Sequence, residues 1–249
     1  MNYSRKELYK LLKSKKILAL GTRGTVLIND DSTLLKIPKE VEFIHDYKSY
    51  LDSINSLKYK MYEFKESEIN QKKFMEIGNS FNFVDFASDI LYLDDMYIGV
   101  IIKWYKGYCK LFDYPFVDDK ELIEIVKHLI ECNALLIKKG IYHLDLLFIN
   151  ILYNKKDLKI IDIDGDAIKY SSITNELYEH FSYESLFSGL ESLLPVMFKN
   201  KEFLERQSLY FDLISSPDYD TINYSSAKKL IKQIDREGIF RKWNRWWYG

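Results

Sequence analysis

The chain has 249 residues, a formal net charge of −1 at pH 7 and 47% hydrophobic residues, which is enough apolar material for one domain or for two small lobes. Acidic and basic residues are interspersed, so neither nucleic-acid binding nor a polybasic membrane patch is expected. The two cysteines, Cys109 and Cys132, lack metal-ligand spacing and favour free thiols in a reducing cytoplasm. No run of about 18 apolar residues occurs, so no transmembrane segment is expected.

The first part of the chain predicts a short amphipathic helix over residues 1–16 and then a small sheet. Strands are expected at 16–20, 25–29 and 32–37, and the last of them carries Lys36 inside an apolar run. The first two strands are joined by the turn Gly21-Thr22-Arg23-Gly24. Glycines allow a backbone to approach phosphate oxygens, although two glycines in a hairpin are also typical of an ordinary turn. A single strand lysine is likewise typical of a solvated edge position.

The middle of the chain alternates helix and strand signals. Residues 46–77 predict a long helix, with a break left open, and it carries the acidic residues Glu63, Glu66 and Glu68. On a purely structural interpretation these three are solvated partners of neighbouring lysines. Strands are expected at 89–93 and 97–103. A helix is expected at 118–139, with Asp118 as its N-cap and Gly140 as its C-terminal stop.

Four polar residues of the types that phosphoryl transfer needs follow that helix. His143, Asp145 and Asn150 share one loop, and Asp162 follows the next apolar run. Phosphoryl transfer needs a carboxylate that orients the attacking hydroxyl, which suits Asp145. It also needs oxygen ligands for magnesium, which suits Asn150 and Asp162. His143 is expected to be structural, because the carboxylate already has the proton-accepting position.

The rest of the chain predicts helices. One helical stretch is expected at 176–198, and two or three helices over 199–249 with a loop near 215–223. The last stretch, 236–247, concentrates Arg, Lys and Trp. We expect an amphipathic terminal helix that packs its tryptophans on the protein, with a membrane or partner anchor as the alternative.

The order of these features resembles the protein-kinase-like superfamily over roughly residues 15–170. The segment from Ala19 to Val26 is similar to the family's glycine-rich loop except that Ala19 replaces the first glycine. The loop from His143 to Asn150 is similar to H-x-D-x-x-x-x-N, and Asp162 begins the metal-binding triplet. The resemblance implies an α+β, bilobal fold. Residues 1–104 would form an antiparallel-sheet N-lobe with one main helix, and 105–249 a mostly helical C-lobe.

The resemblance also implies ATP and magnesium as ligands and assigns roles to residues. Lys36 would hold the α- and β-phosphates and pair with one of Glu63, Glu66 and Glu68, among which the family pattern favours Glu66, with Glu68 next. Asp145 would orient the acceptor hydroxyl, and Asn150 and Asp162 would bind magnesium. The remaining nucleotide contacts that it implies are Gly21, Gly24, Val26, the hinge residues Ile102, Lys103 and Tyr105, and Leu152.

Departures from the family pattern leave the acceptor open. A protein Ser or Thr hydroxyl suits the glycine loop, the strand lysine and the hinge. A small molecule such as a sugar, an amino alcohol or an aminoglycoside suits Leu147, where protein kinases carry Lys. It also suits Asp164, where they carry Gly, and the lack of an Ala-Pro-Glu triplet. A protein acceptor is the leading expectation. A nucleotide-binding pseudokinase is the further alternative, disfavoured because Lys36, Asp145 and Asp162 are all present.

Overall fold

The computed structural model describes residues 1–21, 24–38, 46–57, 61–78, 81–115, 119–163, 168–197 and 200–240. The chain divides into two compact units. The first comprises Met1–Gly107 and Ile161–Asp166, and the second comprises Tyr108–Ile160 and Ala167–Gly249. Residues 161–166 were expected in the second lobe but belong to the first unit. The fold is mixed α+β, as expected.

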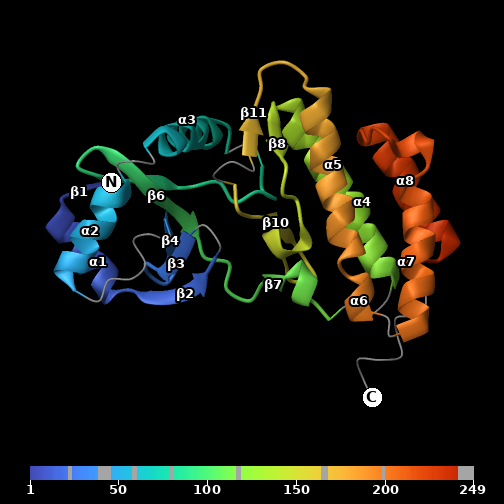
Figure 1. The fold of residues 1–249 in the computed structure, drawn as a ribbon, viewed down its shortest axis with the longest axis horizontal. Coiled ribbons are helices and arrows are strands. Elements are labelled where there is room, and N and C mark those ends of the chain that lie inside the picture. The colour runs from blue at the N-terminus through green and yellow to red at the C-terminus, as the bar shows by residue number, and fades with distance from the viewer. Residues whose placement is uncertain are drawn as a thin grey trace. The chain divides into compact units, whose positions relative to one another are not determined.

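The first unit is built on a six-stranded sheet in the order β1-β5-β6-β4-β3-β2 (Figure 1). Its strands are β1 (Asn2–Tyr3), β2 (Lys16–Leu20), β3 (Gly24–Ile28), β4 (Thr33–Pro38), β5 (Asp89–Leu93) and β6 (Met96–Lys103). The five strands expected from the sequence are thus confirmed, with small shifts at their ends. All neighbours are antiparallel except β1, which runs parallel to β5. The expectation of a purely antiparallel sheet is wrong at this edge, because a two-residue strand has no alternation to recognise.

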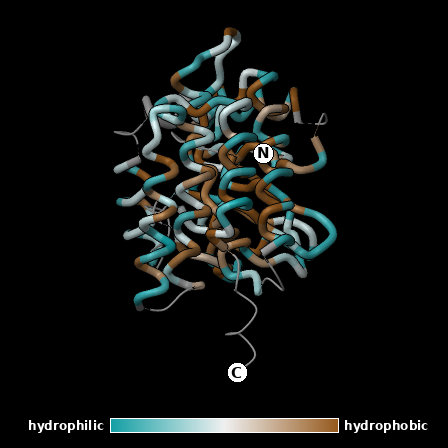
Figure 2. The backbone as a smooth tube through the Cα atoms, turned by 90° about the vertical axis from the view of Figure 1, so that its right-hand side faces the viewer, coloured by the Kyte–Doolittle hydropathy of each residue, from teal (hydrophilic) through white to brown (hydrophobic). Residues whose placement is uncertain are grey.

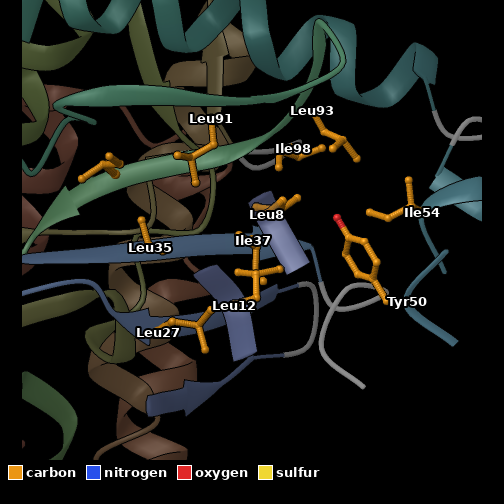
Figure 3. Packing of buried hydrophobic residues seen from close by; sticks show 11 residues of the cluster. Leu8, Leu12, Leu27, Leu35, Ile37, Tyr50, Ile54, Leu91, Leu93 and Ile98 are labelled. Carbon is orange, nitrogen blue, oxygen red and sulfur yellow. The ribbon is translucent and has the colours of Figure 1, made fainter. Parts of the chain in front are cut away.

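Helices cover both faces of this sheet. Leu8 and Leu12 of α1 (Arg5–Ser14) pack in one core with Tyr50 and Ile54 of α2 (Tyr47–Leu57) and with strand residues that include Leu91 (Figure 3). A second cluster, which includes Ile90, contacts Met75 of α3 (Met61–Gly78). Ile90 and Leu91 are consecutive strand residues and point to opposite faces, so α3 lies on the face opposite α1 and α2.

The expectation of one main helix in this part of the chain is therefore wrong. The stretch 46–77, predicted as helical with a break left open, forms two helices, α2 and α3, which lie on different faces of the sheet. Tyr50 and Ile54 form the apolar stripe of α2, and Met75 belongs to the apolar side of α3. Helical periodicity detects each stripe but does not say which face of a sheet will receive it. The short helix expected at the N-terminus is confirmed as α1.

A bulge in β6 brings it close to the strand that carries the candidate lysine. Leu91 pairs with Gly99, whereas the next residue, Tyr92, pairs with Tyr97, so the register shifts there. Gly99 has φ +148°, and a Cβ on it would lie 2.2 Å from the carbonyl oxygen of Lys36. Only glycine allows β6 to approach β4 at this point.

Replacing Gly99 with Ala is expected to lower the free energy of unfolding by about 3 kcal/mol, because the added Cβ must displace the backbone of a central strand. Gly107→Ala is the matched control, since Gly107 also has a positive φ (+82°) but no atom lies within 4 Å of a Cβ placed there. It should lose only about 1 kcal/mol from the left-handed backbone. Urea unfolding measures both variants, and equal losses would contradict the steric account.

The second unit combines helices with short strands. Its helices are α4 (Asp119–Lys138), α5 (Glu176–Glu191), α6 (Leu194–Met197), α7 (Asn200–Ile214) and α8 (Tyr224–Glu237), with short 3₁₀ turns η3 (Leu111–Asp113), η4 (Phe148–Asn150) and η6 (Pro217–Tyr219). One small sheet has the order β10-β9-β7 and the other pairs β11 with β8. These strands are β7 (Cys109–Lys110), β8 (Ile141–His143), β9 (Ile151–Tyr153), β10 (Leu158–Ile160) and β11 (Ile168–Tyr170). Helix α4 contacts α5 and α8 (Figure 1).

The helices expected in this unit are largely confirmed. The helix at 118–139 is α4, although its predicted N-cap Asp118 lies outside the described residues. The stretch 176–198 divides into α5 and α6, and α7 and α8 flank the expected loop. The terminal helix expected from 236 does not begin there: α8 ends at Glu237, and Gly238 caps it with φ 63°. Residues 241–249 lie outside the described part.

The helices show the hydropathy pattern of a folded protein with internal cores. In Figure 2, hydrophobic and hydrophilic segments alternate along the outer helices, as expected where one helix face is buried. Within the described ranges, none of the helices combines the length and the apolar character needed to cross a bilayer.

Candidate functional site

Lys36 is held in the middle of the first unit's sheet. It lies on β4, opposite Val26 of β3 and Val100 of β6. Its neighbours Leu35 and Ile37 belong to the core under α1 and α2. Because side chains alternate along a strand, Lys36 points to the other face, which is the face that α3 covers. Its side chain is 21% exposed.

The glycine-rich turn lies beside this lysine. The Gly21 N–H donates a 2.8 Å hydrogen bond to the carbonyl oxygen of Gly24, which closes the turn. A Cβ on Gly24 would lie 2.8 Å from the carbonyl oxygen of Ile37 and 3.9 Å from the Lys36 side chain. Gly24 is therefore required for β3 to approach β4. Thr22 and Arg23 lie outside the described residues.

Asp162 forms an ion pair with Lys36, although 126 residues separate them in sequence. Its backbone has φ 66°, a left-handed conformation that costs most non-glycine residues roughly 1–2 kcal/mol and Asp somewhat less. The other described non-glycine residues with positive φ lie in the turns between β5 and β6 or between β9 and β10, and they are Asp94, Asp95 and Lys155. Asp162 belongs to neither of these hairpins, and contacts with other parts of the fold can hold its conformation.

Helix α3 supplies one such contact. The buried amide of Gln71 donates from Nε2 to the carbonyl oxygen of Ile163, the residue after Asp162. Gln71 was not predicted from the sequence, because a single Gln in a charged helix is usually exposed to solvent. It is buried here because a segment some 90 residues later in the chain packs against it.

The carboxylate of Glu68, one of the candidates for pairing with Lys36, has other partners. It accepts hydrogen bonds from Lys72 Nζ at 2.6 Å and from the Tyr92 hydroxyl at 3.0 Å. Partial burial raises the pKa of Glu68, but these hydrogen bonds outweigh it and hold the pKa below its ordinary value. Glu68 thus anchors α3 to β5. The side chains of Glu63 and Glu66 lie outside the described residues, so pairing of Glu66 with Lys36 stays a prediction.

The second unit brings Asp145 and Asn150 together. The Asn150 amide donates from Nδ2 to the Asp145 backbone oxygen at 2.8 Å and to its carboxylate Oδ2 at 3.0 Å. The Asp145 N–H donates to Nδ1 of the fully buried His143 at 3.3 Å. These contacts close the loop on itself and orient the carboxylate. His143 thus has a structural contact in the loop, in line with its expected role.

Helices α4 and α5 support this loop from behind. The Ser182 hydroxyl of α5 lies 2.8 Å from Asn133 Oδ1 of α4 and 3.0 Å from the backbone oxygen of His143. A Cβ on Gly189 would lie 2.9 Å from Phe148 Cδ1 and 3.0 Å from its backbone nitrogen, so α5 approaches η4 closely. The sequence analysis missed Ser182 and Gly189. A glycine inside an apolar helical stretch was the available signal for the second.

The other predicted nucleotide contacts are divided between the units. Ile102, Lys103 and Tyr105 lie at the end of β6 and just after it in the first unit, as do Gly21, Gly24 and Val26 on their hairpin. The Tyr105 hydroxyl donates to Asp85 at 3.3 Å. Leu152 lies on β9 of the second unit, paired with Lys159 and Lys110.

A shallow cavity of about 390 Å³, largely open to solvent, lies beside Asp145 within the second unit. Its lining includes Leu144, Asp145, Leu147, Phe181, Glu184 and Ser185. The Ser185 hydroxyl is buried without a hydrogen-bond partner among the described residues. No basic residue is among the described side chains that line the cavity.

The residues present fit magnesium and a nucleotide phosphate chain. Magnesium is held by few protein oxygens plus substrate phosphates, and Asp162 offers a carboxylate. Asn150 directs its amide NH₂ into the loop, so Oδ1 is the atom that it could offer to a metal. No group of three or more His, Cys, Asp or Glu side chains with metal-binding geometry occurs in the described part of the chain. A magnesium site completed by phosphates needs no such group.

Comparison with models of known protein families and with curated proteins finds no match for this chain.

Proposed function

We propose that the protein is a phosphotransferase of the protein-kinase-like type, which uses ATP and magnesium and moves the γ-phosphate to a hydroxyl group. Lys36 holds the α- and β-phosphates beside Gly21 and Gly24, and Asp162 and Asn150 bind magnesium. The metal neutralises charge that develops on the phosphates. Asp145 orients the acceptor hydroxyl and takes up its proton. Positioning and electrostatic stabilisation supply most of the rate.

The pairing of Lys36 with Asp162 carries this proposal. Both side chains are partly exposed, at 21% and 40%, and such ion pairs contribute only about 0–1 kcal/mol to stability. Asp162 also has an unfavourable backbone conformation. A costly conformation that secures a weak ion pair is poorly explained by stability, and residues of this kind cluster at functional sites. A cation for phosphates beside a carboxylate for magnesium is the arrangement that phosphoryl transfer requires.

The open cavity beside Asp145 supports a small molecule as a second candidate acceptor. Asp145 and Glu184 give it negative charge, and Leu147 and Phe181 give it an apolar wall. A small cationic compound with a hydroxyl group, such as an amino alcohol or an aminoglycoside, matches this lining. A protein Ser or Thr remains the expectation from the family resemblance.

Magnesium-dependent ATP turnover tests the proposal. The purified protein is assayed with and without magnesium, against a generic protein, sugars, amino alcohols and aminoglycosides, beside the variant Asp162→Asn. We expect acceptor-dependent turnover that requires magnesium and is lost in the variant. Transfer of labelled γ-phosphate from ATP to the generic protein or to the chain itself identifies a protein kinase. Turnover only with an amine-bearing alcohol identifies a small-molecule kinase. Tight nucleotide binding without turnover on any acceptor would favour a pseudokinase, and no nucleotide binding would contradict the proposal.

A further inference from the structure

Gln71 is the one described residue of α3 that is both polar and almost fully buried, with 1% of its surface exposed. A buried amide without a partner is unfavourable, so a helix that merely covered a sheet would carry an apolar residue there. Gln71 instead donates from Nε2 to the backbone oxygen of Ile163. That oxygen belongs to the residue directly after the left-handed Asp162.

Contacts on neighbouring turns attach α3 firmly to the sheet. Met75 packs against the cluster that includes Val100, and Glu68 accepts a hydrogen bond from Tyr92 of β5. Val100 is also the residue that pairs with Lys36 across β4 and β6. The sheet therefore positions α3, and α3 reaches the segment 161–163 through Gln71. The same sheet carries Lys36, so the positions of both members of the ion pair depend on this sheet.

We propose that Gln71 is a positioning residue that holds Asp162 in its left-handed conformation at Lys36, and so sets the geometry with which Asp162 binds magnesium on the nucleotide. This inference rests on the proposed function. Gln71 touches neither the nucleotide nor the metal in this account, because it acts through the backbone of Ile163. Helix α3 thereby couples the strand lysine to the metal-binding carboxylate.

The test uses the full chain with Gln71→Leu, which keeps the volume and removes the donor, and Asn70→Leu as the control on the adjacent position of the same helix. Hydrogen exchange follows the backbone amides of 161–163, and titration follows the magnesium dependence of ATP binding. We expect Gln71→Leu to exchange about tenfold faster in this segment and to need about tenfold more magnesium. ATP binding without magnesium should be unchanged, and the control should match the unaltered protein.

A second variant guards against misfolding of the first. Gln71→Asn keeps an amide donor on a side chain that is one methylene shorter, so its exchange and magnesium response should lie between those of the unaltered protein and those of Gln71→Leu. A purely structural role would give lower stability in both variants with no change in magnesium dependence, and that result would overturn the inference. An unaltered protein that shows no magnesium-dependent ATP binding would overturn the proposed function too. The exchange measurement, which needs no nucleotide, separates these two failures.

Discussion

Replacing Asp145 with Asn should reduce phosphoryl transfer by roughly 10²- to 10⁴-fold, the usual contribution of a positioned general base. The amide is nearly isosteric and its oxygen can still accept from Asn150, whose Nδ2 lies 3.0 Å from Asp145 Oδ2. The loop should therefore keep its fold. An amide, however, cannot accept the acceptor's proton. ATP binding should remain within a factor of about three, because Asp145 is assigned to the acceptor and not to the phosphates.

Steady-state turnover and equilibrium nucleotide binding, measured on the same preparations, check this result. Asp212→Asn is the matched control, since Asp212 is an exposed residue of α7 in the same unit. It should have full activity. Turnover above one tenth of the normal rate in the Asp145 variant would contradict the role assigned to its carboxylate.

The second large effect is expected at Lys36. Lys36→Met removes the ammonium that is proposed to hold the phosphates, and turnover should fall roughly 100-fold or more, with weaker ATP binding. Stability should change by less than about 1 kcal/mol, because the ion pair with Asp162 is partly exposed. The combination of a large functional loss and a small change in stability is the informative result.

Urea unfolding and ATP titration measure the two quantities separately. Lys16→Met is the control, because Lys16 is an exposed lysine on β2 of the same sheet. It should change neither. If Lys36→Met lost several kcal/mol of stability and kept its turnover, the pair with Asp162 would be structural, and the proposed function would lose its main support.

The sequence was most informative where structure depends on near neighbours. Strands at β2 to β6 and helices α1 and α4 were predicted because alternation, three-and-four periodicity and turn residues act over short stretches. It was least informative about the face of the sheet against which each helix packs. The stretch at 46–77 divided into α2 and α3 on opposite faces of the sheet, and no local pattern specifies that choice.

The same division holds for the candidate site. The sequence by itself determined the inventory: a lysine on a strand beside a glycine turn, a loop with Asp145 and Asn150, and Asp162 after the next strands. The Asn150–Asp145 contact spans five residues and follows from that loop. Three contacts depend on the tertiary structure alone. Asp162 forms an ion pair with Lys36, and Gly99 allows β6 to approach the backbone of Lys36. The buried Gln71 donates a hydrogen bond to Ile163. Each of these contacts joins residues more than 60 positions apart, so it depends on how sheet and helix pack and leaves no local pattern in the sequence.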